Sequence, residues 1–344
     1  MKVVVAIDSL KGSLSSLEAG DAIRAGILRA DSSAEVLVRP LADGGEGTVE
    51  ALTIGMGGTL QEVRVTGPLG APVTAVYGIL QDGKTAILEM AAAAGITLVE
   101  EKERNPLNTT TYGVGEMIRD AIAKGCRHFI VGIGGSATND GGIGMLQALG
   151  YGLLDSKGEQ VPFGAKGLQV LDCITDENVI PELADCTFRV ACDVTNTLCG
   201  DQGCSAVFGP QKGADPGMIM QMDKWLAYYA ALAREKYEKA NPRQAGTGAA
   251  GGLGFAFLTF TGQTVMGKAP SGVAQIAKQF GKPVIAFAGA VTPDAVACNA
   301  HGIYAFFPIL RRISTLQEAM EPENARQNMT DTVEQALRLF LLKK

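Results

Sequence analysis

The segment that most constrains the fold is a glycine-rich loop between an apolar run and a helical pattern. Residues 129–131 are Phe-Ile-Val, residues 132–142 read Gly-Ile-Gly-Gly-Ser-Ala-Thr-Asn-Asp-Gly-Gly, and a helical pattern follows over 143–149. A strand, a glycine loop and a helix in this order present backbone N–H groups to a phosphate. Asp140 adds a carboxylate beside this anion site, which is favourable if a metal cation lies between the two.

The composition narrows the class of protein. The net charge is −6 and no basic run exceeds two residues, so we expect no nucleic-acid partner. The seven cysteines include no CxxC pair, which indicates free thiols rather than a disulfide framework or a zinc site. No apolar stretch reaches ~18 residues, and Met1-Lys2 runs directly into an apolar strand. These features predict a cytoplasmic protein without membrane contact.

The order of predicted elements indicates an α/β fold. A strand–helix–strand pattern opens the chain over 3–7, 17–30 and 36–38, and similar alternation returns after residue 273. Short strands divided by Gly-Pro and Asp-Gly turns lie between them, at 63–65, 73–80 and 85–90. We therefore predict a parallel-sheet domain that is interrupted by a second domain of mixed-sheet α/β type.

Four aspartates come just after predicted strands: Asp8, Asp43, Asp140 and Asp193. Ligands of open α/β sheets bind beyond the carboxyl ends of the strands. Each aspartate alone also suits a turn or a helix cap. Four of them in glycine-rich loops favour a binding site.

Two loops near the N-terminus suit a nucleotide and its metal. In the first, Lys11 supplies a point charge for a phosphate oxygen, and Ser13 either binds phosphate or caps the following helix. No Walker A sequence occurs in the chain. In the second, Asp43 and Glu46 flank Gly44 and Gly45; the segment suits either a plain turn or magnesium held by a carboxylate and by nucleotide phosphates.

The candidate base is Asp193. His128 and His301 are the only histidines, and His128 precedes a predicted strand, at the wrong end for a site. A carboxylate is therefore the expected acceptor of a substrate hydroxyl proton. Lys212, in a turn, either clamps an acid or phosphate group or is simply solvated.

Two other interpretations of the glycine loop stay open. Residues 132–137 fit the dinucleotide fingerprint G-x-G-x-x-A, with Asp155 downstream. Asp140 opposes this, because it would repel a pyrophosphate that brings no metal. A hydrolase elbow with Ser136, Asp193 and His301 has the expected chain order but lacks the last glycine of G-x-S-x-G.

Eight short motifs occur in a fixed order. They are 8–15, 42–48, 89–93, 104–106 with 109–113, 132–142, 190–194, 207–214 and 248–252. Together they make the chain resemble bacterial glycerate kinases of the first type over nearly its whole length. The resemblance implies ATP-dependent phosphorylation of D-glycerate at the 2-hydroxyl, with Mg²⁺ as cofactor; phosphorylation of the 3-hydroxyl, which would give 3-phosphoglycerate, stays open as the alternative. It also implies a flavodoxin-like domain of residues 1–47 and 256–344, with residues 48–255 inserted into it.

The expected site joins these motifs in a cleft between the two domains. We expect phosphates on Ser13, Gly44, Gly45, Gly134, Gly135 and Ser136, and magnesium on Asp43, Glu46 or Asp140. Asp193 and Lys11 are the expected catalytic residues, and Lys212, Asn139 and Asp8 the expected glycerate contacts. Alternatives from other classes are a non-catalytic module that binds sugar acids or nucleotides and an NAD-dependent dehydrogenase. The expected oligomeric state is a monomer or a homodimer.

The chain departs from the family near Phe260–Gly262. Relatives carry additional residues there, including an apolar strand that ends in a turn like Thr-Gly-Glu-Gly, whereas here residues 255–260 run almost directly into 263–268. By the family layout this strand belongs to the flavodoxin-like sheet, and its loss would leave backbone groups of its neighbours unpaired. Either the sequence omits these residues, which an intact mass well above 35.8 kDa would show, or the deletion is real and impairs activity.

Overall fold

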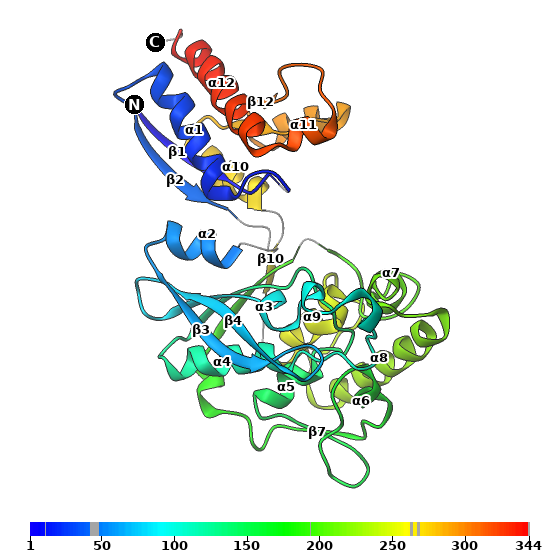
Figure 1. The fold of residues 1–344 in the computed structure, drawn as a ribbon. Helices are drawn as coiled ribbons and strands as arrows, with labels where there is room; N and C mark the ends of the chain where they lie inside the picture. The colour runs from blue at the N-terminus through cyan, green and yellow to red at the C-terminus, as the bar shows by residue number, and fades with distance from the viewer. Residues whose placement is uncertain (11, 42–47, 193, 262–263, 267–268, 343–344) are drawn as a thin grey trace. The chain divides into compact units, whose positions relative to one another are not determined.

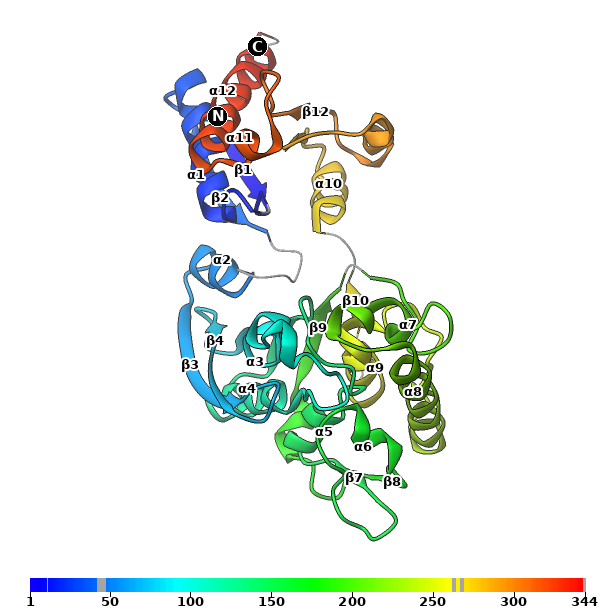
Figure 2. The same cartoon turned by 45° about the vertical axis from the view of Figure 1, so that its right-hand side comes forward.

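The computed structural model describes residues 1–10, 12–41, 48–192, 194–261, 264–266 and 269–342. The chain divides into two compact units (Figures 1 and 2). Unit 1 comprises residues 1–43 and 268–344, and unit 2 comprises residues 44–267. Unit 2 ends at residue 267, which is later than residue 255, the end of the inserted domain expected from the sequence. The reason is that helix α9 (Ala249–Phe260) is almost wholly buried within unit 2.

Unit 2 contains a six-stranded sheet in the order β10-β9-β6-β5-β4-β3. Its strands are β3 (Thr59–Thr66), β4 (Pro72–Ile79), β5 (Thr85–Glu89), β6 (His128–Gly132), β9 (Thr187–Ala191) and β10 (Thr264–Met266). Strands β3, β4 and β5 are antiparallel, which confirms the predicted meander, and β5, β6, β9 and β10 are parallel. A separate antiparallel pair joins β7 (Gly152–Leu154) and β8 (Cys173–Thr175).

Aromatic side chains and helices build the core of unit 2. Phe129 of β6 stacks on Phe188 of β9 with ring centroids 4.7 Å apart, and Phe257 of α9 packs against Phe188 at 5.7 Å. The remaining helices are α2 (Thr48–Gly55), α3 (Ala91–Ala94), α4 (Tyr112–Ala123), α5 (Ile143–Ala148), α6 (Ala165–Gln169), α7 (Cys204–Phe208) and α8 (Pro216–Lys236). Short 3-10 turns cover 96–98, 101–103, 181–185 and 210–212.

Unit 1 contains two separate parallel pairs of strands. Strand β1 (Lys2–Ile7) pairs with β2 (Glu35–Pro40), and β11 (Ile285–Ala288) pairs with β12 (Ala305–Pro308). Its helices are α1 (Ser16–Ala30), α10 (Ala269–Gln279), α11 (Leu316–Met320) and α12 (Pro322–Leu341), with a 3-10 segment over Pro293–His301. The predicted strand–helix–strand opening of the chain is thus confirmed.

Helices α1 and α12 pack closely in unit 1. Ile23 and Ile27 of α1 share a buried core with Met329 and Val333 of α12. Gly26 permits this approach, because a Cβ there would collide with the Thr330 carbonyl oxygen. Strands from both small sheets, through Val5 and Phe287, contact the same core, so one apolar centre organises the unit.

One prediction about unit 1 was wrong. The run Val3-Val4-Val5-Ala6-Ile7 predicts a strand buried on both faces. The structure buries Val5, which is 5% exposed, but leaves Val4 60% exposed. One face of β1 is therefore largely uncovered by the part of the chain that the structure describes.

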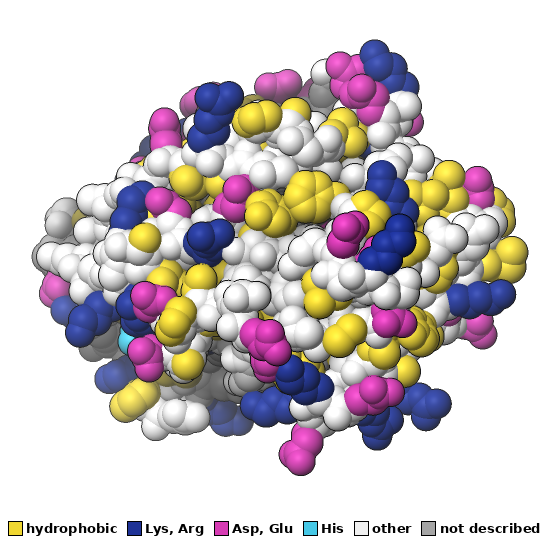
Figure 3. Space-filling model, turned by 90° about the horizontal axis from the view of Figure 1, so that it is seen from below, with side chains coloured by type: hydrophobic (Ala, Val, Ile, Leu, Met, Phe, Trp, Pro, Cys, Tyr) yellow, Lys and Arg dark blue, Asp and Glu magenta, His cyan; other side chains and the backbone are white. Residues whose placement is uncertain are grey.

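The chain is a mixed α/β protein with several small sheets, as the predicted α/β class requires. On the face in Figure 3, basic and acidic side chains are interspersed. In the described residues, no helix combines the length and the apolar character needed to cross a membrane.

Candidate active site

The parallel part of the unit 2 sheet brings four strand ends to one level. Glu89 of β5 lies opposite Gly132 of β6, and Gly132 lies opposite Ala191 of β9. Ala191 in turn lies opposite Met266 of β10. The glycine loop leaves β6 at this edge. The register therefore puts it where open parallel sheets bind ligands.

Only the first part of the glycine loop reaches the surface. Gly134 and Gly135 are exposed, whereas residues 136–142 are buried. Gly135 has φ +71°, a left-handed conformation that glycine adopts without strain. No described residue accepts a hydrogen bond from the N–H of Gly134, Gly135 or Ser136. These consecutive N–H groups are thus available to an anion.

Neighbouring segments hold the loop in place. Ile96 N–H donates to the Gly135 carbonyl (2.8 Å), and Ala137 N–H donates to the Ala94 carbonyl (2.9 Å). The Thr109 hydroxyl donates to the Ala137 carbonyl at 2.9 Å. The carbonyls of Gly135 and Ala137 are therefore occupied by the protein, whereas the N–H groups of Gly134, Gly135 and Ser136 have no acceptor among the described residues.

Lys212 lies beneath the loop. Its side chain is 2% exposed, and its Nζ donates to Ser136 Oγ (2.7 Å) and to the Thr138 carbonyl (2.6 Å). Burial lowers the pKa of Lys212 from 10.5 to about 8, while the charges of Cys204 and Asp140 oppose that change. From the sequence, Lys212 was expected either to be solvated or to contact glycerate. In the structure it is a buried cation that is hydrogen-bonded to the loop itself.

Asp140 organises the other end of the loop. Its Oδ2 accepts hydrogen bonds from the N–H and the hydroxyl of Thr111, both at 2.8 Å, and its Oδ1 accepts from Gly142 N–H at 3.1 Å. The carboxylate is fully buried, and this burial raises its pKa against the effect of those bonds. Three donors occupy its oxygens, so the geometry does not fit the expected magnesium ligand.

Asn139 also faces the protein interior. It is fully buried, and its Nδ2 donates to Ser205 Oγ at 2.8 Å. Asn139 Oδ1 and Thr138 Oγ1 are buried without a hydrogen-bond partner in the described structure. The expected contact between Asn139 and glycerate would need the loop to open, because no part of this side chain reaches solvent.

Comparison with known proteins decides the family. The family model described as the glycerate kinase family matches residues 3–263 and 259–341. The chain belongs to the glycerate kinase family. It is 43% identical to the glycerate kinase of Haemophilus influenzae, over 100% of both chains, and 44% identical to the glycerate 2-kinase of Escherichia coli, over 93% of each. A crystal structure described as a glycerate kinase 2 from Salmonella typhimurium LT2 is 42% identical, with a TM-score of 0.88, and the match covers 100% of this chain and 98% of that one. The prediction of an ATP-dependent glycerate kinase is confirmed by these relationships.

The same comparisons show where the match between this chain and the glycerate kinase family is interrupted. The two matched stretches meet at residues 259–263. The alignment with the Haemophilus relative spans 378 positions, whereas this chain has 344 residues. The relatives thus carry positions that this chain lacks, and the break lies at the junction where the sequence departs from the family pattern.

Glu89 is a further candidate site residue that sequence reasoning did not select. It is 8% exposed, ends β5 beside Gly132, and accepts a hydrogen bond from Val49 N–H at 2.8 Å. Ligands of open parallel sheets bind beyond the carboxyl ends of the strands, which is where this buried carboxylate lies. Its place directly after an apolar strand was the signal available in the sequence.

The expected residues of the N-terminal loop lie in unit 1. Asp8 follows β1 and its Oδ1 accepts a hydrogen bond from Ser9 N–H at 2.7 Å. Ser15, rather than Ser13, caps α1, through a reciprocal capping box with Glu18. Ser13 Oγ is buried with no hydrogen-bond partner in the described residues.

Several expected residues lie outside the described part of the chain, namely Lys11, Asp43, Gly44, Gly45, Glu46 and Asp193. Their roles remain predictions. In the described residues, no three His, Cys, Asp or Glu side chains gather where they could hold a metal ion.

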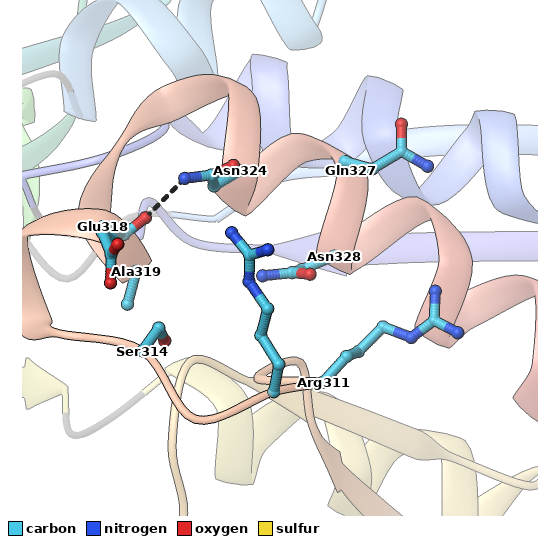
Figure 4. A pocket seen from close by; sticks show the side chains of 8 residues that line it. Arg311, Ser314, Glu318, Ala319, Asn324, Gln327 and Asn328 are labelled. Carbon is cyan, nitrogen blue, oxygen red and sulfur yellow. Dashed lines mark hydrogen bonds between the residues drawn. The ribbon is translucent and has the colours of Figure 1, made fainter.

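A pocket in unit 1 contains none of the expected site residues (Figure 4). It lies between α11 and the first turns of α12, where Asn324 Nδ2 donates to the Glu318 carbonyl at 2.8 Å. Its lining comprises Arg311, Arg312, Ser314, Glu318, Ala319, Asn324, Gln327 and Asn328. Arg311 is paired with Asp331 of α12, so part of the positive charge of this pocket is already neutralised.

Proposed function

We propose that this chain phosphorylates the 2-hydroxyl of D-glycerate with ATP to give 2-phosphoglycerate and ADP. Family membership supports the reaction, and the name of the Escherichia coli relative supports the 2-hydroxyl. The observation that carries the proposal is the Gly134–Ser136 turn, in which Gly134 and Gly135 are exposed. Its free N–H groups sit at the carboxyl end of a parallel sheet, with a buried lysine bonded beneath them.

We assign the phosphates of ATP to this turn. Oriented N–H groups hold phosphate oxygens and stabilise the charge that develops during phosphoryl transfer. Lys212 contacts the turn through the hydroxyl of Ser136. In this proposal it therefore acts as a positioning residue, because its charge reaches the phosphates only through the turn. In this proposal Lys11, Ser13, Gly44 and Gly45 complete the phosphate contacts.

Asp43 and Glu46 would hold magnesium in this scheme. When bound, the ion offsets phosphate charge. Asp140 is left out of this set because Thr111 and Gly142 occupy its oxygens. Asp8 and Asn139 remain proposed glycerate contacts, the second conditional on opening of the buried loop end.

Asp193 is the proposed base. It comes two residues after Ala191, whose strand ends level with Gly132. The attacking hydroxyl oxygen forms a bond to the γ-phosphorus, and the bond from that phosphorus to its bridging oxygen breaks. The hydroxyl proton goes to the Asp193 carboxylate, and ADP leaves.

The domain assignment follows the same resemblance. We propose that unit 1 is the flavodoxin-like domain and unit 2 the domain inserted into it. Two separate strand pairs in unit 1, both parallel, support this view. A cytoplasmic location and a monomeric or homodimeric state also remain proposals.

The test is a coupled assay for ADP with D-glycerate, followed by phosphorus NMR of the product. We expect ADP release that depends on D-glycerate and a product with phosphate on carbon 2. A 3-phosphoglycerate product would overturn the regiochemistry. Nucleotide or glycerate binding without ADP release would indicate a binding module, and a change in NADH absorbance would indicate a dehydrogenase.

A further inference from the structure

Arg104 carries a charge that the described part of the protein does not pair. Its Nε is buried without a hydrogen-bond partner, and its guanidinium forms no ion pair with a described residue. Glutamates at 100, 101 and 103 are close in the chain, but all three are exposed, and Glu100 pairs with Lys102 at 2.7 Å. Buried donors are normally hydrogen-bonded, because an unmade bond costs free energy. Arg104 as a whole is only half-buried, so a solute can reach its side chain.

The segment that carries Arg104 is attached to the glycine loop at both ends. Before it, Ile96 N–H donates to the Gly135 carbonyl at 2.8 Å. After it, the Thr109 hydroxyl donates to the Ala137 carbonyl at 2.9 Å. Arg104 lies between these two anchors in the chain, directly after the 3-10 turn at 101–103. The backbone of Arg104 is therefore held in the neighbourhood of the loop.

Arg104 also contacts the turn that carries Lys212. The next residue, Gly213, has φ +89°. A Cβ on Gly213 would collide with the carbonyl oxygen of Arg104 and lie 3.1 Å from the Arg104 Cβ, so the two segments touch through their backbones. Lys212 Nζ reaches the loop at Ser136 Oγ. Two cationic residues from separate segments thus adjoin one loop, and their combined potential favours an anionic ligand.

We propose that Arg104 binds the carboxylate of D-glycerate and so determines the preference for a hydroxy acid over an uncharged alcohol. This inference rests on the proposed function and deepens it. A guanidinium offers parallel N–H donors that match the two oxygens of a carboxylate. The Gly134–Ser136 turn then serves the phosphates of ATP, and Arg104 serves the acid group. Sequence reasoning gave the acid to Lys212, whose ammonium group is instead bonded to the loop itself.

The first test compares D-glycerate with D-glyceramide, its uncharged amide, in the ADP assay with the full chain. The unaltered chain should prefer D-glycerate in kcat/KM at least about tenfold, as a charge-assisted hydrogen bond implies. Arg104→Met should raise the KM for D-glycerate at least about tenfold for the same reason and remove most of the preference. The KM for ATP should stay unchanged. A preference that survives in Arg104→Met would overturn the inference, as would a rise in the KM for ATP alone, which would assign Arg104 to a phosphate.

Calorimetric binding of D-glycerate separates this inference from the proposed function. It is measured with and without a non-hydrolysable ATP analogue. If the unaltered chain binds D-glycerate, Arg104→Met does not, and neither releases ADP, the inference holds and the proposed kinase activity fails. If both release ADP with the same KM for D-glycerate, the kinase activity holds and the inference fails. An unaltered chain that neither binds D-glycerate nor turns it over overturns both.

Arg127 provides a matched control. It is half-buried like Arg104, but its Nη1 donates to the carbonyls of Ile122 (3.0 Å) and Cys126 (2.7 Å). It precedes β6, at the end of that strand away from the glycine loop. Arg127→Met should lower the free energy of unfolding and leave the KM for D-glycerate unchanged, and Arg104→Met should do the reverse. Equal destabilisation, with an equal loss of turnover on both substrates, would make Arg104 a structural residue and contradict the proposal.

A second variant decides if Arg104→Met does not fold. Arg104→Lys keeps the charge but loses the planar fork of donors. The preference for D-glycerate over D-glyceramide should then fall, while the KM for ATP stays the same. An unchanged preference in Arg104→Lys would overturn the assignment of the carboxylate to the Arg104 guanidinium.

Discussion

Lys212 Nζ donates a hydrogen bond to Ser136 Oγ over 2.7 Å, so a buried cation supports the loop whose N–H groups are free. This contact joins the 3-10 turn at residues 210–212 to the loop that follows β6, more than seventy positions earlier in the chain. It gives the loop both a fixed shape and a positive potential. Either effect favours an anion at Gly134–Ser136.

Lys212→Met should impair both stability and turnover. Methionine keeps the unbranched stem but leaves Ser136 Oγ and the Thr138 carbonyl without their donor, which costs about 1–3 kcal/mol. We expect kcat to fall at least about tenfold if the charge supports phosphoryl transfer. Urea unfolding and the ADP assay measure the two effects. Lys224→Met, on the exposed side of α8, should change neither; equal losses in both variants would refute a special role for Lys212.

The lowered pKa of Lys212 should make the free energy of unfolding depend on pH. Its pKa is about 8 in the folded chain and 10.5 as its ordinary value. Between these values the unfolded chain binds more protons than the folded chain, so stability rises with pH across this window. The gain from pH 8 to 10.5 should approach about 3 kcal/mol in the native chain relative to Lys212→Met. Unfolding free energies of the two proteins, measured across this range, provide the check; a constant difference would contradict the lowered pKa.

Gly135→Ala should separate the cost of backbone strain from the loss of anion binding. Gly135 has φ +71° and Gly83, in an exposed turn, has φ +65°. Alanine at either position should cost about 1 kcal/mol of stability, because a Cβ disfavours the left-handed region. Only Gly135→Ala should raise the KM for ATP, because its Cβ would stand beside the proposed phosphate site. If Gly83→Ala raises KM equally, the effect is not local.

Asp140→Asn should destabilise the fold. The amide offers one acceptor oxygen where the carboxylate serves three donors from Thr111 and Gly142. In a fully buried position the unsatisfied groups should cost about 3 kcal/mol. Asp82 accepts a similar set of bonds from Lys84 and Thr85, but in an exposed turn. Asp82→Asn should therefore cost much less in thermal unfolding, and an equal loss would show that burial does not govern the Asp140 network.

Asp193→Asn should reduce kcat by about a hundredfold or more, the range expected when a general base is lost. The KM values should change less, since the amide keeps the size of the side chain. Steady-state kinetics of ADP release measures both constants. Turnover close to that of the unaltered chain would remove Asp193 from the mechanism and direct attention to Glu89, a carboxylate that the structure places at this sheet edge.

Local patterns predicted many elements correctly. The apolar run before Gly132, the meander of β3 to β5 and the opening strand–helix–strand unit all follow from hydrophobic period and turn chemistry, which act over a few residues. The loop at 132–142 was found for the same reason. The glycine, serine and aspartate residues of this loop favour turn conformations through their own local chemistry.

Burial and partners could not be predicted in this way. Asp140 looked like a metal ligand because its sequence neighbours are glycines, yet Thr111 from a distant segment occupies its oxygens. Lys212 looked solvated or directed at substrate, yet it lies under the loop. Glu89 looked like the end of a strand, yet the register places it beside Gly132.

The sequence by itself determined the α/β class, the glycine-rich loop after β6 and membership of the glycerate kinase family. Each of these depends on residue types at short spacing. The tertiary structure decided which polar groups face a ligand and which face the protein, because hydrogen-bond partners and burial come from segments far apart in the chain. It also decided that β1, whose sequence is that of an interior strand, keeps an open edge in the described structure. A strand's neighbours are supplied by other parts of the chain, so the apolar pattern of β1 alone does not show whether both neighbours are present.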